Sequence, residues 1–151
     1  MAKPKIGIIC GSKSDLPVLV KTEAQLKEFG IAYDITIASA HRTPNKVEQY
    51  ARSAEQKYDL IIAAAGMAAA LPGAVAAHTH LPVIGIPIHS QGLGGHDALF
   101  SIVQMPPGVP VATVAIDGGK NAAILAAQVL ALKYPELRAR LKKLKKGLAK
   151  A

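Results

Sequence analysis

The chain is poor in aromatic residues and in cysteine. Of its 151 residues none is tryptophan, two are phenylalanine and four are tyrosine, whereas half are hydrophobic. This composition predicts a single domain whose core is built from aliphatic side chains and alanine. The single cysteine, Cys10, excludes an internal disulfide and is typical of a reducing compartment, so we expect a cytoplasmic protein.

Charged residues are missing from the middle of the sequence. Residues 60–96 contain no Asp, Glu, Lys or Arg, and between 60 and 116 only Asp97 is charged. The run is long enough to cross a membrane, but glycines, prolines and histidines interrupt it, and we therefore expect no membrane association. We expect this segment to be deeply buried, with part of its surface covering another copy of the chain in a homo-oligomer.

The net charge of +8 belongs almost entirely to one end of the chain. Residues 133–151 hold eight basic residues and one acidic residue (+7), and the other 132 residues hold ten and nine (+1). Nucleic-acid binding usually needs basic groups spread over a face, with aromatic residues among them. We therefore predict a solvated basic helix at 133–151, outside a main domain at 1–132, and no nucleic-acid partner; an acidic partner is the alternative.

Strand and helix patterns alternate along the whole chain. The expected strands are apolar, β-branched runs at 5–10, 34–38, 60–64, 82–87 and 111–116. The expected helices lie at 15–30, at 44–54 behind a Thr43 cap, at 71–78, 97–104 and 121–132, and from Pro135 onward. This alternation predicts a doubly wound α/β domain with a parallel sheet, whose ligand-binding loops follow the strand ends.

Two loops after expected strands carry residues suited to chemistry. The second strand is followed by Ser39-Ala40-His41-Arg42-Thr43-Pro44. Arginine can hold a phosphate by two parallel hydrogen bonds, and histidine can move a proton near neutral pH. The first strand is followed by Gly11-Ser12-Lys13-Ser14-Asp15, which can accept an anion, while Asp15 could cap a helix or bind a ribose diol. Together the loops indicate an enzyme acting on a phosphorylated small molecule.

The later strand ends suggest an apolar wall and a mobile cover. Residues 66–73, after the third strand, are small and apolar, which suits a flat ring or carbon dioxide, or equally close helix packing. The glycine-rich segment 89–95 follows the fourth strand and could move over a site. Neither a CxxC pair nor histidines at metal-ligand spacing occur in the sequence, so we expect no metal.

Five motifs in this order resemble one enzyme family. The chain is similar to the class I 5-(carboxyamino)imidazole ribonucleotide mutases of purine biosynthesis, the family of the phosphoribosylaminoimidazole carboxylase catalytic subunit. The resemblance runs from about Lys5 to Leu132. The motifs that carry it are Gly11–Asp15, Ser39–Pro44, Leu71-Pro72-Gly73, Ser101–Pro106 and Asn121-Ala122-Ala123. It implies a three-layer αβα, flavodoxin-like catalytic domain at 1–132, assembled as a homo-octamer, that uses no cofactor.

The resemblance also implies an activity and a set of site residues. The reaction would move a carboxylate from the exocyclic nitrogen of an aminoimidazole ribonucleotide to ring carbon C4, with carbon dioxide as an intermediate. His41 would be the catalytic proton carrier. The implied substrate-binding residues are Ser12, Asp15, Ser39 and Arg42 at the ribose phosphate, Gly66, Met67, Ala69 and Leu71 around the base and carboxylate, and Ser90 closing the pocket.

One departure from the family pattern keeps an alternative open. The family usually has a histidine where this chain has Ala70, and a second glycine where it has Met67. The alternative is a lyase, an aminoimidazole ribonucleotide carboxylase that uses carbon dioxide directly, which an apolar pocket would also suit. A non-catalytic nucleotide- or flavin-binding module on the same fold is a further alternative, although the scarcity of aromatic residues argues against a stacked flavin.

Overall fold

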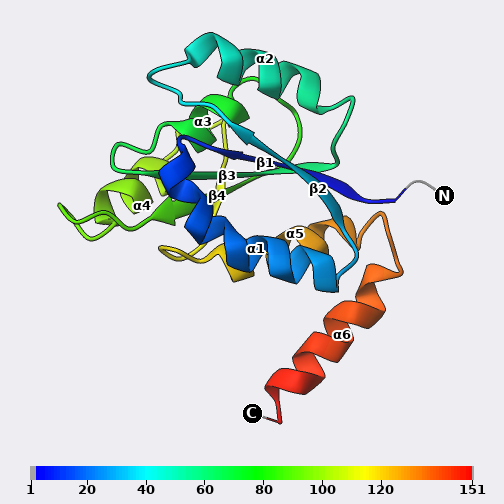
Figure 1. The fold of residues 1–151 in the computed structure, drawn as a ribbon. Helices are drawn as coiled ribbons and strands as arrows, with labels where there is room; N and C mark the ends of the chain where they lie inside the picture. The colour runs from blue at the N-terminus through cyan, green and yellow to red at the C-terminus, as the bar shows by residue number, and fades with distance from the viewer. Residues whose placement is uncertain (1–2, 151) are drawn as a thin grey trace.

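The computed structural model, which describes residues 3–150, is a three-layer αβα sandwich around a parallel sheet (Figure 1). The strand order is β2-β1-β3-β4-β5. The strands are β1 Lys5–Cys10, β2 Ala32–Ile37, β3 Leu60–Gly66, β4 Val83–Ile88 and β5 Ala112–Thr113. The helices are a 3₁₀ turn η1 Lys13–Asp15, then α1 Leu16–Glu28, α2 Pro44–Ala54, α3 Leu71–Ala76, α4 His96–Val103, α5 Gly119–Leu130 and α6 Leu137–Leu148. The predicted fold class is confirmed.

Most predicted elements lie within two residues of their observed bounds, but the prediction for the fifth strand was wrong. It was expected over 111–116, whereas β5 pairs with β4 only at Ala112 and Thr113. Val114 still donates to the carbonyl of Gly85 (3.2 Å), and Asp117 donates to that of Pro87 (2.8 Å). Because Pro87 has no N–H to give in return, the regular ladder cannot continue past this point.

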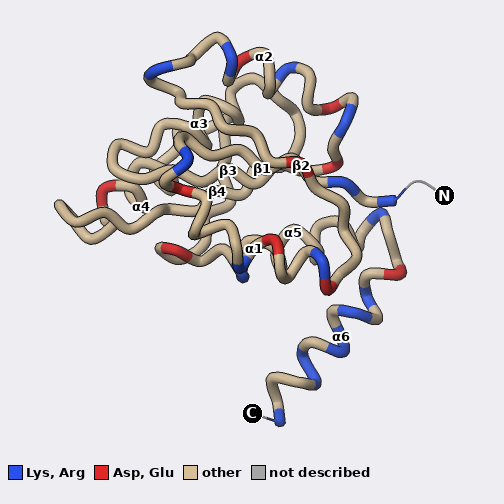
Figure 2. Tube along the Cα trace, in the orientation of Figure 1, with Lys and Arg blue, Asp and Glu red and all other residues tan. Residues whose placement is uncertain are grey.

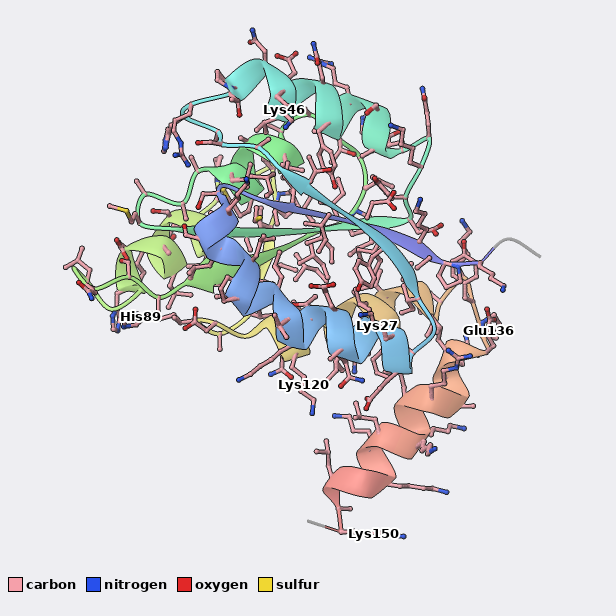
Figure 3. All side chains as sticks on the ribbon, viewed as in Figure 1. Lys27, Lys46, His89, Lys120, Glu136 and Lys150 are labelled. Carbon is pink, nitrogen blue, oxygen red and sulfur yellow. The ribbon has the colours of Figure 1, made fainter. Side chains whose placement is uncertain are left out.

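The core consists of two apolar layers, one on each face of the sheet. α1 and α5 cover one face, with Leu19, Leu26 and the alanines of α5 packed on β1, β3 and β4. α2, α3 and α4 cover the other face. Residues 60–65 of β3 are buried throughout, as expected for a parallel strand covered on both sides. Figure 3 shows side chains filling the space between sheet and helices, with Lys120 and Lys150 at the outer surface.

The last helix is attached to the domain by one apolar stripe. Leu137 is buried, and Leu141 and Leu144 pack partly against the layer that includes α1 and α5. Arg140 donates a hydrogen bond to the carbonyl of Phe29, at the end of α1. The far end of α6 extends away from the body with Leu148 exposed, and basic residues follow its length (Figures 1 and 2).

Within residues 3–150, none of the helices combines the length and apolar character needed to cross a bilayer.

Candidate functional site

A cavity of about 970 Å³ lies at the carboxyl ends of β1, β2, β3 and β4. The chain leaves β1 toward β2 on one side and reaches β3 on the other, so the cavity is at the topological switch point of the sheet. Its volume is that of a small-molecule site. All ten residues predicted for the site line it: Ser12, Asp15, Ser39, His41, Arg42, Gly66, Met67, Ala69, Leu71 and Ser90. Their individual roles stay predictions.

The turn between β2 and α2 is closed by its own hydrogen bonds. The Ser39 N–H donates to Thr43 Oγ1 (2.9 Å), and this hydroxyl donates to the Ser39 carbonyl (3.1 Å). The Arg42 N–H donates to Ser39 Oγ (3.2 Å). Thr43 therefore precedes α2 as predicted, but its side chain does not cap the helix, because its hydroxyl holds the turn instead. This network fixes the backbone beside His41 and Arg42.

Arg42 joins the two polar loops. Its Nη2 donates to the carbonyl of Gly11 (3.2 Å), which links the loop after β2 to the loop after β1. A guanidinium carries five N–H donors, so this bond leaves donors for an anion in the cavity. Lys13 lines the cavity from the first loop and adds a second positive charge. The cavity therefore has one cationic end, built from two loops.

Asp15 supports the first loop from within. Its Oδ2 accepts a hydrogen bond from the Ser12 N–H (2.9 Å), and its side chain does not cap α1, which begins at the next residue. Burial raises the pKa of Asp15 above its usual value, while the N–H groups of Ser12 and Gly11 and the charge of Arg42 act in the opposite direction. The carboxylate of Asp15 therefore stabilises the loop between β1 and α1.

His41 is free to meet a ligand. Its side chain is exposed at the cavity, and among residues 3–150 its ring has no hydrogen-bond partner. The rigid turn described above carries it, so the imidazole is placed by its backbone alone. Such a group can exchange a proton with a bound molecule.

The loop after β3 forms an apolar wall, as predicted. Ala69 and Leu71 are buried, whereas Met67, Ala68 and Ala70 are exposed along the cavity. Two tight turns shape the loop: the Ala69 N–H donates to the Met67 carbonyl (2.8 Å), and the Ala70 N–H donates to that of Ala68 (2.7 Å).

Several lining residues were given no individual role from the sequence, although some of them belong to the segments 11–15 and 66–71 that were expected at the site. Lys13 and Ser14 follow a strand end, and this position was the available signal; the hydroxyl of Ser14 shares a short hydrogen bond with that of Ser12. His89 begins the glycine-rich segment 89–95 that was expected to cover a site; it is exposed at the edge of the molecule (Figure 3) and also lines the cavity. The other lining residues without an individual predicted role are Gly11, Ala40, Ala65, Ala68, Ala70 and Ile88.

In the described part of the chain, no three His, Cys, Asp or Glu side chains gather where they could hold a metal ion. Cys10 lies buried at the end of β1, beside the cavity, and burial raises the pKa of its thiol to about 11, with the charge of Asp15 adding to the effect. The thiol is therefore protonated at neutral pH and a poor nucleophile.

Fold and cavity together define a doubly wound α/β protein with a small-molecule pocket at the switch point of its sheet. The family model of AIR carboxylase matches residues 5–151, and the chain belongs to this family. The N5-carboxyaminoimidazole ribonucleotide mutase of Thermotoga maritima is 58% identical over 146 residues, which are 96% of this chain and 85% of that protein. The enzyme of the same description from Pyrococcus abyssi is 55% identical over 146 residues, 96% of this chain and 84% of that one.

Two further comparisons extend this result. The phosphoribosylaminoimidazole carboxylase of Saccharomyces cerevisiae is 57% identical over 131 residues, which are 86% of this chain but 23% of the yeast protein. The crystal structure of Treponema denticola PurE superposes with a TM-score of 0.90 at 34% identity, covering 98% of this chain and 93% of that chain. The resemblance seen in the sequence motifs, and the fold that it implied, are therefore confirmed.

Proposed function

We propose that the chain catalyses the N5-carboxyaminoimidazole ribonucleotide mutase reaction, an isomerisation in purine biosynthesis. The observation that carries this proposal is 55–58% identity to mutases over 96% of the chain. The cavity is consistent with it, because it offers a cationic end for a phosphate, an apolar wall for a heterocycle and an imidazole for proton transfer.

The ribose phosphate binds at the cationic end. One guanidinium N–H of Arg42 bonds to the Gly11 carbonyl, and the other N–H groups can bind the phosphate. The hydroxyls of Ser12 and Ser39 lie on the same two loops and line the cavity. Asp15 supports the first loop and faces the ribose. The base then extends toward the wall formed by Gly66, Met67, Ala69 and Leu71, and Ser90 closes the pocket from β4.

His41 supplies both proton steps. Protonation of the exocyclic nitrogen accompanies cleavage of its bond to the carboxylate carbon, which leaves as carbon dioxide. The electron-rich C4 of the ring attacks this carbon, and a base removes the C4 proton, so the atoms of substrate and product balance. A single imidazole can donate the first proton and accept the second, because histidine can act both as a general acid and as a general base.

The apolar wall keeps the two halves of the reaction together. Carbon dioxide held against methyl groups is close to C4, which raises its effective concentration there. The same wall excludes the water that would hydrate the gas. The pocket thereby favours transfer to C4 over escape.

The test is to offer purified protein each nucleotide separately. We expect the carboxyamino nucleotide to be converted without added bicarbonate, in a reaction followed by chromatography of the product. Conversion of aminoimidazole ribonucleotide with excess bicarbonate, and of no other substrate, would instead identify a carboxylase.

We also propose that the chain acts as a homo-octamer in the cytoplasm. Support for assembly comes from Phe100 and Val103 on α4, which are large, apolar and exposed in a region almost free of charge. The free, buried Cys10 is compatible with a reducing compartment.

A further inference from the structure

Met67 has an unusual backbone conformation for its side chain. Its φ is +56°, and within residues 3–150 the other non-glycine residue with positive φ is Asp117. Short polar side chains such as aspartate tolerate the left-handed region through local hydrogen bonds, but methionine has no polar group that could do so. Glycine would adopt this conformation more easily, so the methionine is unfavourable for folding at this position.

The side chain of Met67 does not offset this penalty by packing in the core. It is 68% exposed, although methionine is apolar, and it lines the cavity. The wall around it is made of very small residues, namely Gly66, Ala68 and Ala70. Leu71 and Ile88, the larger apolar residues of the cavity, are almost completely buried. Met67 is therefore the long apolar side chain that this wall presents to a ligand.

We propose that Met67 is a positioning residue that covers the bound heterocycle and retains carbon dioxide until C4 captures it. This inference rests on the proposed function. A thioether chain is flexible and polarisable, so it can pack against the face of an aminoimidazole ring that the short alanines cannot reach. Met67 takes part in no bond-making step. It acts between cleavage of the nitrogen–carboxylate bond and formation of the C4–carboxylate bond, when the gas is free.

The test follows the fate of a ¹³C-labelled carboxylate in unlabelled bicarbonate. We expect the wild-type protein to retain most of the label in its product. Met67→Ala shortens the side chain, and Met67→Gly also removes the penalty for the left-handed backbone. Met67→Leu keeps a large apolar side chain. In the Ala and Gly variants we expect the ratio of released aminoimidazole ribonucleotide to product to rise about tenfold, equivalent to roughly 1.4 kcal/mol in relative barrier height. Met67→Leu, which keeps the apolar bulk, should retain much more of the label than the Ala and Gly variants.

The variants separate this role from a structural one. Met67→Gly should melt no lower than wild type, because glycine accepts the left-handed backbone, so a leak in this variant cannot be due to unfolding. Unchanged label retention in Met67→Ala would overturn the inference, as would a leak in Met67→Gly alone or an equal leak in Met67→Leu. Failure of the proposed function would be visible earlier, as a wild-type protein that does not convert the carboxyamino nucleotide.

Discussion

The polar side chains that line the cavity differ in the hydrogen bonds that they already make within the protein. The hydroxyl of Ser39 and the carboxylate of Asp15 each accept a backbone N–H, so they shape their loops before any ligand arrives. His41, by contrast, has no bond to its ring among the described residues and stands on a turn that its neighbours close. A group that contributes nothing to its own loop is free to be used in chemistry.

Replacing His41 by asparagine should therefore remove catalysis without disturbing the fold. We expect kcat to fall by about 10²–10⁴-fold, the usual contribution of a general acid–base group. The melting temperature and the dissociation constant of a nucleotide measured by calorimetry should stay close to wild type. His96→Asn is the matched control, because His96 is exposed outside the cavity. Near-normal turnover in His41→Asn would exclude the proton-transfer role.

The positions of these residues could be predicted from the sequence, whereas their contacts could not. Parallel strands end at one edge of the sheet, so the loops at 11–15, 39–44 and 66–71 had to meet once the strands were recognised. That Arg42 donates to Gly11, or that Asp15 holds Ser12, depends on side-chain distances across separate loops. The left-handed backbone of Met67 was also invisible, because nothing in the residue type indicates it.

At the scale of elements, α6 is fixed at one end and free at the other. A helix was predicted from Pro135 onward, and the structure packs Leu137, Leu141 and Leu144 against the domain while leaving Leu148 exposed. The length of β5 was less predictable. Pro87 is visible in the sequence, but only the sheet order shows that the N–H it lacks would have bonded to β5.

Removing the buried end of the α6 stripe should destabilise the whole protein. Leu137 is 1% exposed, and Leu137→Ala should lower the free energy of unfolding by about 2–5 kcal/mol, the usual range for a buried leucine. Leu148→Ala makes the same change at a residue 59% exposed and should stay within about 0.5 kcal/mol of wild type. Urea denaturation measures both. Equal effects would mean that α6 does not depend on its attachment to the core.

Asp59 connects the start of β1 to the segment before α6, and this connection should depend on pH. Its carboxylate accepts hydrogen bonds from Lys133 Nζ (2.7 Å), the Tyr134 hydroxyl (2.9 Å) and the Lys5 N–H (3.1 Å). Burial alone would raise the pKa of Asp59, but these donors outweigh it and hold the pKa below its usual value. The stabilisation is thus complete above the unfolded-state pKa of about 3.9 and is lost as the pH falls through the lower folded-state value.

The variant Asp59→Asn should accordingly be less stable than wild type by about 1–3 kcal/mol at neutral pH, the usual cost of weakening hydrogen bonds to a charged group. The difference should persist down to about pH 5 and shrink below about pH 4, as the wild-type carboxylate becomes protonated. Denaturation curves at several pH values measure it, with Leu137→Ala as a pH-independent reference. A difference that stays constant to pH 3 would contradict the assignment.

At the scale of the whole molecule, charge and apolar surface are separated. Lys and Arg residues lie along α6, while the part of the chain that forms β3, α3, β4 and α4 contains one carboxylate and no Lys or Arg (Figure 2). Within that part, Leu93, Phe100 and Val103 are large, apolar and exposed. Water does not favour such a surface, and a second copy of the chain would cover it.

We therefore expect sedimentation to find an octamer, and Phe100→Glu to shift the protein to smaller species. Phe100 is 59% exposed on α4, so a charge there costs little in the isolated fold but would be desolvated in an interface. Leu132→Glu, at a residue 81% exposed after α5, places the same charge near the basic end of the chain and should leave assembly unchanged. A wild-type monomer at all concentrations would refute the octamer. Unchanged assembly in Phe100→Glu would instead place the interface elsewhere, because a buried, unpaired carboxylate could not be tolerated between tightly packed copies.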